Sequence, residues 1–147
     1  MNLNHLYRAV IMEHYKNPLH KGLIEDPSYF IVHLHNPSCG DDMTVQVKTD
    51  GKHILDIRHE GTGCSICCSS ASVMSETLID KDIAFALKVI SEFYNLLMAK
   101  PYDETLLIGD ALAYGGVSQF PARIKCASLA WKALEQGLIR EGENSNG

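Results

Sequence analysis

Apolar side chains recur every three or four residues in the first part of the chain, and the same spacing returns in three later stretches. This spacing places them on one face of a helix. The N-terminal stripe consists of Leu3, Leu6, Tyr7, Val10, Ile11 and Tyr15. We expect this helix to stop near Asn17-Pro18, because proline disfavours the helical conformation in the residue before it. The stretch from Leu19 to Ser28 lacks a period and predicts a loop.

An extended pattern follows between residues 29 and 59. The stretch Tyr29 to His35 is rich in residues that favour strands, while Met43 to Thr49 and Ile54 to His59 alternate between apolar and polar side chains. Alternation is typical of a strand with one face buried. Asp50-Gly51 separates the last two stretches and favours a tight hairpin. The pattern therefore predicts three antiparallel strands.

The second half of the chain predicts helices. Its three apolar stripes are Ile66, Ser70, Val73, Met74, Thr77 and Leu78; then Ile83, Leu87, Ile90, Tyr94 and Leu97; then Ile124, Ala127, Trp131, Leu134 and Leu138. Residues 101–109 predict an irregular segment, followed by a short helix over Asp110 to Tyr114. Pro121 is a favourable first residue for the last helix. Strands followed by helices indicate an α+β fold, with helices packed on one face of a small sheet.

Length and composition set the class of protein. We expect a single domain over residues 1–147, with a frayed polar tail over about 141–147, because 147 residues is an ordinary domain size. The formal net charge is 13 − 18 = −5, which argues against a nucleic-acid partner. No apolar run is long enough to cross a membrane, and the N-terminus lacks the features of a secretory signal. We therefore expect a cytoplasmic protein.

The five cysteines carry the candidate chemistry. Their number is odd, which disfavours a disulfide framework and favours metal or sulfur chemistry, or simple burial. Cys39 lies in a loop between two strands, Cys64 precedes a helix and Cys126 lies in the second turn of the last helix. If these ends converge, one more ligand completes a tetrahedral zinc site. Asp41 is the obvious candidate, and spacing alone leaves Asp42 as a rival.

A site of three thiolates, one carboxylate and a divalent cation has a formal charge of −2. Arg123 or Lys125 is close enough in sequence to Cys126 to offset it. Arg123 is also a candidate for orienting Asp41, although an exposed arginine in the first turn of a helix needs no such role.

Three runs of sequence resemble the IscU/NifU-type family, and more closely its SufU branch. They are Asn36–Asp41, Gly61–Ile66 and Phe120–Cys126, the last followed by Trp131-Lys-Ala-Leu134. The resemblance implies an α+β fold with a metal site at one end of the sheet. The ligands it implies are Cys39, Asp41, Cys64 and Cys126.

Two features separate the branches of this family. Lys125 stands where Isc-type scaffolds have a histidine, and the segment between Cys64 and Cys126 is longer, as in SufU proteins. The SufU resemblance implies a zinc-dependent sulfurtransferase that accepts persulfide sulfur from a SufS-type cysteine desulfurase and passes it to the SufBCD complex. Whether such a carrier is itself an enzyme stays open. The alternatives are a scaffold that assembles a [2Fe–2S] cluster on the same cysteines, and a purely structural zinc site.

Cys39, the two additional cysteines and three histidines need separate interpretations. Cys39 is the predicted persulfide acceptor because it lies on a loop, whereas Cys64 and Cys126 are tied to helices. Cys67 and Cys68 could form a redox pair or an auxiliary acceptor with Cys64, but we favour small residues needed for helix packing. His33 and His35 share one face of a strand and predict exposed sheet residues, and His59 is interpreted as incidental to the site.

Overall fold

The predicted strands form one antiparallel sheet in the order β1-β2-β3. The computed structural model describes residues 3–145, and the strands are β1 (Phe30–Asn36), β2 (Asp41–Thr49) and β3 (Ile54–Thr62). Their register pairs Val32 with Val45 and Val47 with Ile57. β2 starts earlier and β3 ends later than the hydrophobic alternation predicts. The added residues are polar or glycine, yet they extend the ladder by pairing Asp42 with Thr62.

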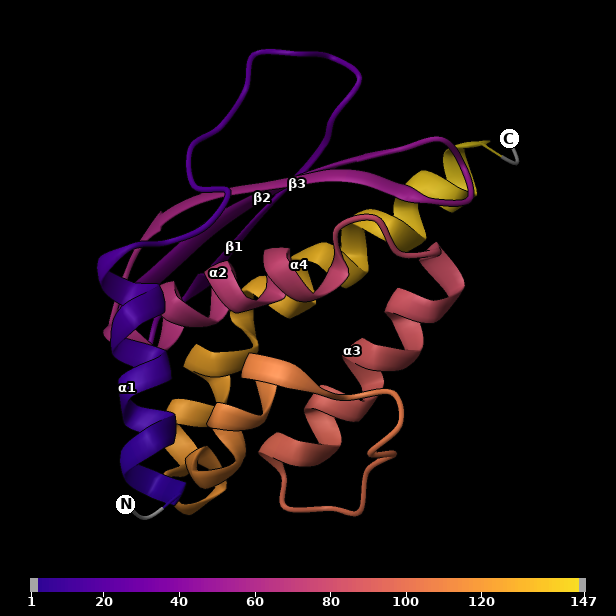
Figure 1. Ribbon diagram of the computed structural model, residues 1–147. Helices are drawn as coiled ribbons and strands as arrows, with labels where there is room; N and C mark the ends of the chain where they lie inside the picture. The colour runs from indigo at the N-terminus through magenta and orange to yellow at the C-terminus, as the bar shows by residue number, and fades with distance from the viewer. Residues whose placement is uncertain (1–2, 146–147) are drawn as a thin grey trace.

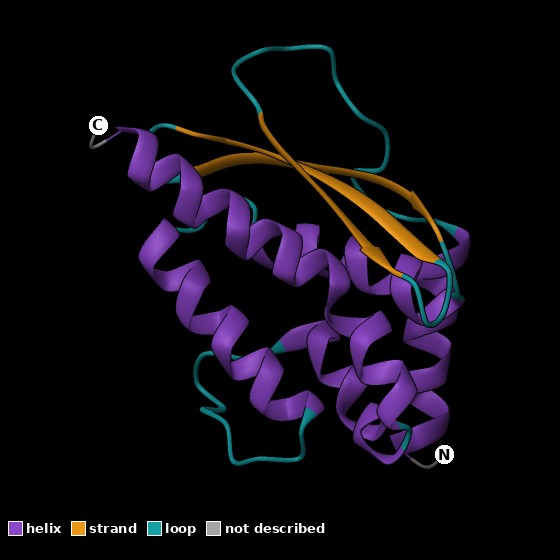
Figure 2. Cartoon of the chain, turned by 180° about the vertical axis from the view of Figure 1, so that it is seen from behind, coloured by secondary structure: helices purple, strands orange, loops and turns teal. Residues whose placement is uncertain are grey.

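All the long helices lie on one face of this sheet, as Figure 1 and the reverse view in Figure 2 show. They are α1 (Leu3–Lys16), α2 (Ser65–Leu78), α3 (Ile83–Leu97) and α4 (Pro121–Ser145). α4 packs against β1 and β2, while α2 packs against β3 and α4. The predicted α+β fold with helices on one face is therefore confirmed. None of the helices described is both long enough and apolar enough to cross a membrane.

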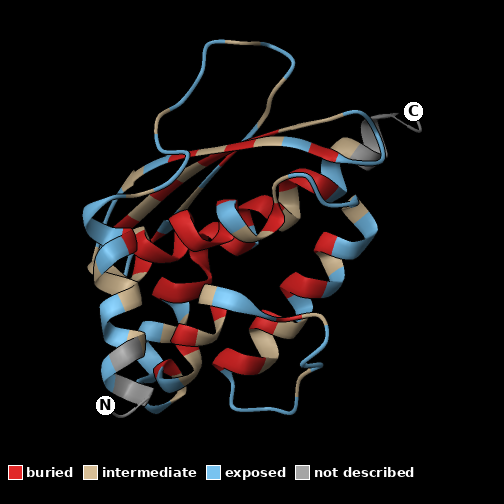
Figure 3. Ribbon diagram, in the orientation of Figure 1, coloured by how far each residue is buried: buried red, intermediate tan, exposed pale blue. Residues whose placement is uncertain are grey.

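The core lies between the two layers (Figure 3). Alternate residues of β2 face it: Met43, Val45 and Val47 are each at most 1% exposed. On the helical side Trp131 stacks on Phe93, with ring centroids 3.9 Å apart. The indole N–H of Trp131 donates to Ser70 Oγ at 2.9 Å, so the largest core side chain has its one polar group satisfied.

The segment between α3 and α4 differs from the short helix predicted at 110–114. It forms an eleven-residue 3₁₀ helix, η1 (Gly109–Gln119). The buried residues Ala111, Tyr114 and Val117 recur every three positions, which matches the three residues per turn of this helix. Their burial against the core outweighs the interruption expected from Gly115-Gly116.

The C-terminal helix also exceeds its prediction. A frayed tail was expected from about Glu141, but α4 continues to Ser145. Glu141 Oε1 accepts a hydrogen bond from Thr49 Oγ1 at 2.8 Å, which ties this turn of the helix to β2. Residues 146–147 of the expected tail lie outside the described part of the chain.

The loop at 17–29 lies on the face of the sheet opposite the helices (Figure 1). The Gln46 side chain holds it there: its Oε1 accepts from Ile24 N at 2.8 Å, and its Nε2 donates to Ile24 O at 2.7 Å. His59 holds the start of the loop, because its Nε2 lies 2.7 Å from the Leu19 carbonyl. Burial lowers the pKa of His59, so the ring is neutral and donates this bond from Nε2. His59 therefore has a structural role.

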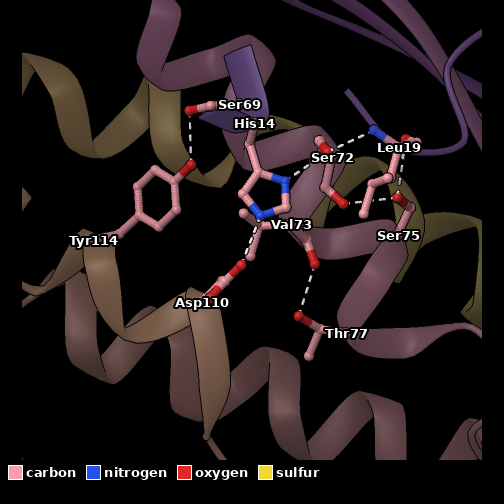
Figure 4. Close-up of polar contacts among 9 residues, drawn as sticks. All are labelled: His14, Leu19, Ser69, Ser72, Val73, Ser75, Thr77, Asp110 and Tyr114. Atoms are coloured by element: carbon pink, nitrogen blue, oxygen red, sulfur yellow. Dashed lines mark hydrogen bonds and ion pairs between the residues drawn. The ribbon is translucent and has the colours of Figure 1, made fainter. Parts of the chain in front are cut away.

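His14 joins α1 to α2 and η1, as Figure 4 shows. Its Nδ1 lies 2.8 Å from Ser72 Oγ, and its Nε2 lies 2.8 Å from Asp110 Oδ2. Ser72 Oγ also accepts from Leu19 N at 2.8 Å. An ionised Asp110 carboxylate only accepts, so His14 Nε2–H donates the hydrogen bond to it. Nearby, Ser69 Oγ and the Tyr114 hydroxyl make a second link between α2 and η1 at 2.7 Å.

We expect His14→Ala to lower the free energy of unfolding by about 2–3 kcal/mol, because it leaves the buried Ser72 hydroxyl without its acceptor. Urea denaturation followed by circular dichroism measures this change. His35→Ala is the matched control, since His35 is exposed on β1, and it should change the free energy by less than about 0.5 kcal/mol. Equal effects of the two variants would show that the bridge does not stabilise the fold.

Candidate metal centre

Three of the predicted ligands meet at one end of the sheet. One ligand atom from each of Cys39, Asp41 and Cys126 lies within 4.8 Å of the other two. The turn at 37–40 joins β1 to β2 and carries Cys39, and Asp41 is the first residue of β2. Cys126 lies in the second turn of α4 and is fully buried. Residues far apart in the sequence therefore converge because α4 packs across β1 and β2.

Cys64 borders this group and is not one of its three members. It is the N-cap residue of α2, and its backbone N–H donates to Asp41 Oδ1 at 3.1 Å. Its thiol interacts with the Cys126 thiol and with the Arg123 guanidinium. Cys64 thus has contacts with two of the three members, Asp41 and Cys126, as well as with Arg123.

Asn36 positions the carboxylate, a role that the sequence analysis did not assign. Asn36 is 6% exposed, and its Nδ2 donates to Asp41 Oδ2 at 3.3 Å. The same nitrogen lies 4.0 Å from Cys126 Sγ, while Asn36 Oδ1 accepts from Ser38 Oγ at 2.8 Å. An asparagine before a proline is typical of a turn, so the pattern alone gives no sign of this contact.

Two glycines make room for this arrangement. A Cβ atom at Gly63 would lie 2.5 Å from Asp41 Oδ1, and one at Gly61 would lie 2.1 Å from the Asp42 carbonyl oxygen. Real Cβ atoms do not approach other atoms so closely. The missing side chain at Gly61 lets β3 lie close to β2, and the one at Gly63 lets the chain pass Asp41 before Cys64.

Burial and the neighbouring acidic groups disfavour the ionised form of the Cys126 thiol. Burial raises the pKa of the Cys126 thiol, and its contacts with Asp41, Cys39 and Cys64 raise it further. The thiols of Cys126 and Cys64 in turn raise the pKa of Arg123, whose guanidinium lies beside them. Sulfur donors with one carboxylate oxygen match the ligand preference of zinc, so the residues present fit this metal. A bound zinc ion would hold the thiols in their ionised form.

The two predicted supporting cations differ in their positions. Arg123 is in contact with the cluster, as described above. Lys125 is exposed, and within residues 3–145 its side chain has no hydrogen bond or ion pair with the cluster. Only Arg123 therefore lies where it can offset the charge of the thiols.

Asp42, the rival ligand, points away from the cluster. Its Oδ1 lies 2.7 Å from His33 Nε2, and its Oδ2 lies 3.9 Å from His35 Nδ1. Successive residues of a strand face opposite sides of the sheet, which separates Asp42 from Asp41. The two histidines are exposed, as predicted.

The additional cysteines have different surroundings. Cys67 is fully buried in a helix whose neighbouring serines and alanine are also buried, which confirms the packing role predicted for it. Burial raises its pKa. Cys68 is half-buried, and its thiol donates to the Gly63 carbonyl at 3.8 Å. All five cysteines are free thiols.

A second group, His14, Glu76 and Asp110, also brings its ligand atoms within 4.8 Å of one another. Both ring nitrogens of His14 already have partners within the chain, namely Ser72 and Asp110. The bond between His14 and Asp110 accounts for the proximity of two of the three members without a metal.

A small antiparallel sheet with helices on one face, and at its end thiols gathered around one buried aspartate that could bind a metal, defines a class of α+β proteins. Within that class, residues 6–127 match the family described as the NifU-like N-terminal domain. The chain belongs to this family, to which the IscU and SufU proteins are related.

Curated relatives resemble the chain over almost its whole length. It is 48% identical to the zinc-dependent sulfurtransferase SufU of Bacillus subtilis, over 95% of this chain and 94% of that protein. It is 38% identical to the iron–sulfur cluster assembly scaffold protein IscU of Streptococcus pyogenes, over 94% of this chain and 86% of the relative.

A solved structure has the same fold. The protein from Fervidobacterium islandicum described as an iron–sulfur cluster assembly scaffold protein for the SUF system superposes with a TM-score of 0.84. The two chains are 34% identical, and the alignment covers 93% of this chain and 99% of the other.

We expect Asp41→Asn to weaken zinc binding by roughly 10–100-fold or more, since losing even an outer partner of a metal site costs that much. In the asparagine, one of the two accepting carboxylate oxygens becomes an NH₂ group, which donates. This change disturbs the hydrogen bond that Cys64 N makes with Asp41 Oδ1. Competition with a chromophoric chelator measures the affinity. Asp42→Asn is the matched control, because it makes the same change one residue away on the other face of β2. Equal affinities for the two variants would exclude Asp41 as a ligand.

Proposed function

We propose that this protein is a zinc-dependent sulfurtransferase in iron–sulfur cluster biogenesis. It accepts persulfide sulfur from a SufS-type cysteine desulfurase and passes it to the SufBCD complex. The observation that carries the proposal is the position of Cys39, a half-buried thiol on a short loop beside Asp41 and Cys126. The likeness to the Bacillus protein named as a zinc-dependent sulfurtransferase supports it.

The different roles proposed for the ligands follow from the secondary structure in which each one lies. Cys126 is fully buried within α4, and Cys64 begins α2, so both share the rigidity of packed helices. Cys39 lies on the turn, where its thiol makes a weak bond to the Ala122 carbonyl at 3.8 Å. In this proposal Asp41, Cys64 and Cys126 hold zinc, and Cys39 is both a ligand and the sulfur acceptor.

The transfer step is an exchange between sulfurs. The Cys39 thiolate attacks the outer sulfur of the persulfide on the desulfurase, and a new S–S bond forms at Cys39 Sγ. The bond between the outer sulfur and the desulfurase cysteine breaks, and its electron pair leaves on that cysteine as a thiolate. One persulfide is consumed and one is formed, so no external oxidant or reductant is needed. The Arg123 guanidinium lies beside the thiols and favours the anionic groups in this exchange.

A second function has its own support. A scaffold that assembles a [2Fe–2S] cluster would use the same cysteines, and the Streptococcus relative is named as such a scaffold. Lys125 and the longer segment before Cys126 favour the first function, because both depart from the Isc-type pattern.

Alanine production by the matching cysteine desulfurase tests the proposal. We expect the zinc-loaded protein to raise the rate by roughly tenfold, equivalent to about 1.4 kcal/mol of the activation barrier. Cys39→Ala should abolish the increase while the fold is retained. Cys68→Ser is the control, since Cys68 is a half-buried thiol outside the proposed ligand set, and it should keep the increase.

An active desulfurase that does not respond to the wild-type protein would overturn the sulfurtransferase function. Anaerobic reconstitution with iron and sulfide then tests the scaffold. A visible absorption spectrum of a [2Fe–2S] cluster on the wild-type chain, absent from Cys39→Ala, would support that second function.

A further inference from the structure

A groove of about 610 Å³ opens beside the metal centre, where α1, the start of α2, η1 and the start of α4 meet. Its apolar lining comes from Tyr7, Ile11, Met12, Ile66, Val117 and Phe120. Phe120 is 61% exposed, although it is a large aromatic side chain. The groove thus offers contact area that a partner's apolar side chain can cover.

The charge of the groove is opposite to that of the whole protein. Its charged lining residues are Arg8 and Arg123, and no Asp or Glu is among the described residues that line it. The chain as a whole has a formal charge of −5. Arg8 is exposed, and within residues 3–145 its side chain has no hydrogen bond or ion pair. An unpaired arginine beside exposed aromatic area is typical of a protein-binding surface.

The groove is continuous with the candidate centre. Arg123 lines the groove and also lies near enough to the thiols of Cys64 and Cys126 for them to raise its pKa. Ser65 lines it as well, and it follows Cys64 directly. A protein segment seated in the groove would therefore lie against the cluster that takes part in sulfur transfer.

We propose that this groove docks a segment of the cysteine desulfurase that presents an apolar side chain flanked by carboxylates. The inference rests on the proposed function, which makes the desulfurase the partner that must reach Cys39. The apolar side chain covers Phe120, and a carboxylate pairs with Arg8. Complementary charge of this kind speeds encounter and fixes orientation, and added salt weakens it.

Charge reversal at Arg8 tests the docking. The readouts are the concentration of zinc-loaded protein that half-saturates desulfurase stimulation, and direct binding by fluorescence anisotropy. Arg8→Glu should raise both constants by roughly tenfold or more and should flatten their dependence on salt. The matched control is Arg140→Glu, because Arg140 is exposed on the same helix as Arg123 but about 25 Å further along it. The control should stay within about twofold of the wild type.

Two phenylalanine variants, one in the groove and one outside it, test the apolar contact separately. Phe120→Ala should weaken binding by roughly tenfold, since buried aromatic anchors carry much of the energy of an interface. Phe85→Ala is its control, because Phe85 is 36% exposed on α3 and does not line the groove. Zinc content measured on every variant separates docking defects from loss of the metal.

The outcomes distinguish the docking from the function. If the wild type stimulates the desulfurase, and Arg8→Glu and Arg140→Glu have equal half-saturating concentrations and binding constants, the groove assignment is wrong. The proposed sulfurtransferase function is then unaffected. A wild type that neither binds nor stimulates the desulfurase overturns both. Sedimentation velocity adds a third outcome: a wild-type dimer that Arg8→Glu dissociates would assign the groove to a second copy of this chain and overturn the desulfurase as its occupant.

Discussion

The buried carboxylate of Asp41 joins the sheet to the helical layer, and the candidate centre depends on it. One oxygen accepts the backbone N–H of Cys64 at the start of α2, and the other accepts the amide of Asn36 at the end of β1. A buried carboxylate is costly unless both oxygens are paired, and the positive end of a helix favours it further. Because Gly63 lacks a Cβ atom, α2 can begin this close to β2.

This contact also separates the part of the site that lies on helices from the part that lies on a turn. Cys64 and Cys126 move only with α2 and α4, whose packing against the sheet spans the core. Cys39 lies on the turn that joins β1, which ends at Asn36, to β2, which begins at Asp41. In the proposed function this turn changes conformation while the anchoring carboxylate and the helix-bound thiols keep their places. A sulfur carrier needs this combination, whereas a structural metal site needs only ligands that keep their places.

Periodicity predicts most of the fold, because nearly every element buries one regular stripe. It fails at the start of β2, where the added residues are polar, and along η1, where the buried residues recur every three positions instead of with the period of an α-helix. The sequence identifies the cysteines and Asp41 as candidate ligands by their residue type. It does not show that they lie close together, because this depends on how α4 crosses the sheet. The choice between Asp41 and Asp42 follows from strand alternation once β2 is known to start at Asp41, which shares a face with buried Met43. Asn36 was missed because its partner is a side chain that no local pattern reveals.

The small number of possible metal ligands limits how the protein can work. Lys125 is exposed while Cys126 is buried, because successive helix residues point about 100° apart, and an ammonium has no lone pair for a metal. Within the described chain, no further histidine, cysteine or carboxylate joins the group formed by Cys39, Asp41 and Cys126. In the proposed function Cys39 leaves that group to carry sulfur, and the described part of the chain then offers no donor beyond Asp41, Cys64 and Cys126. In that proposal we expect the docked desulfurase to complete the site during transfer. A groove that shares Arg123 with the cluster is where such a requirement can be met.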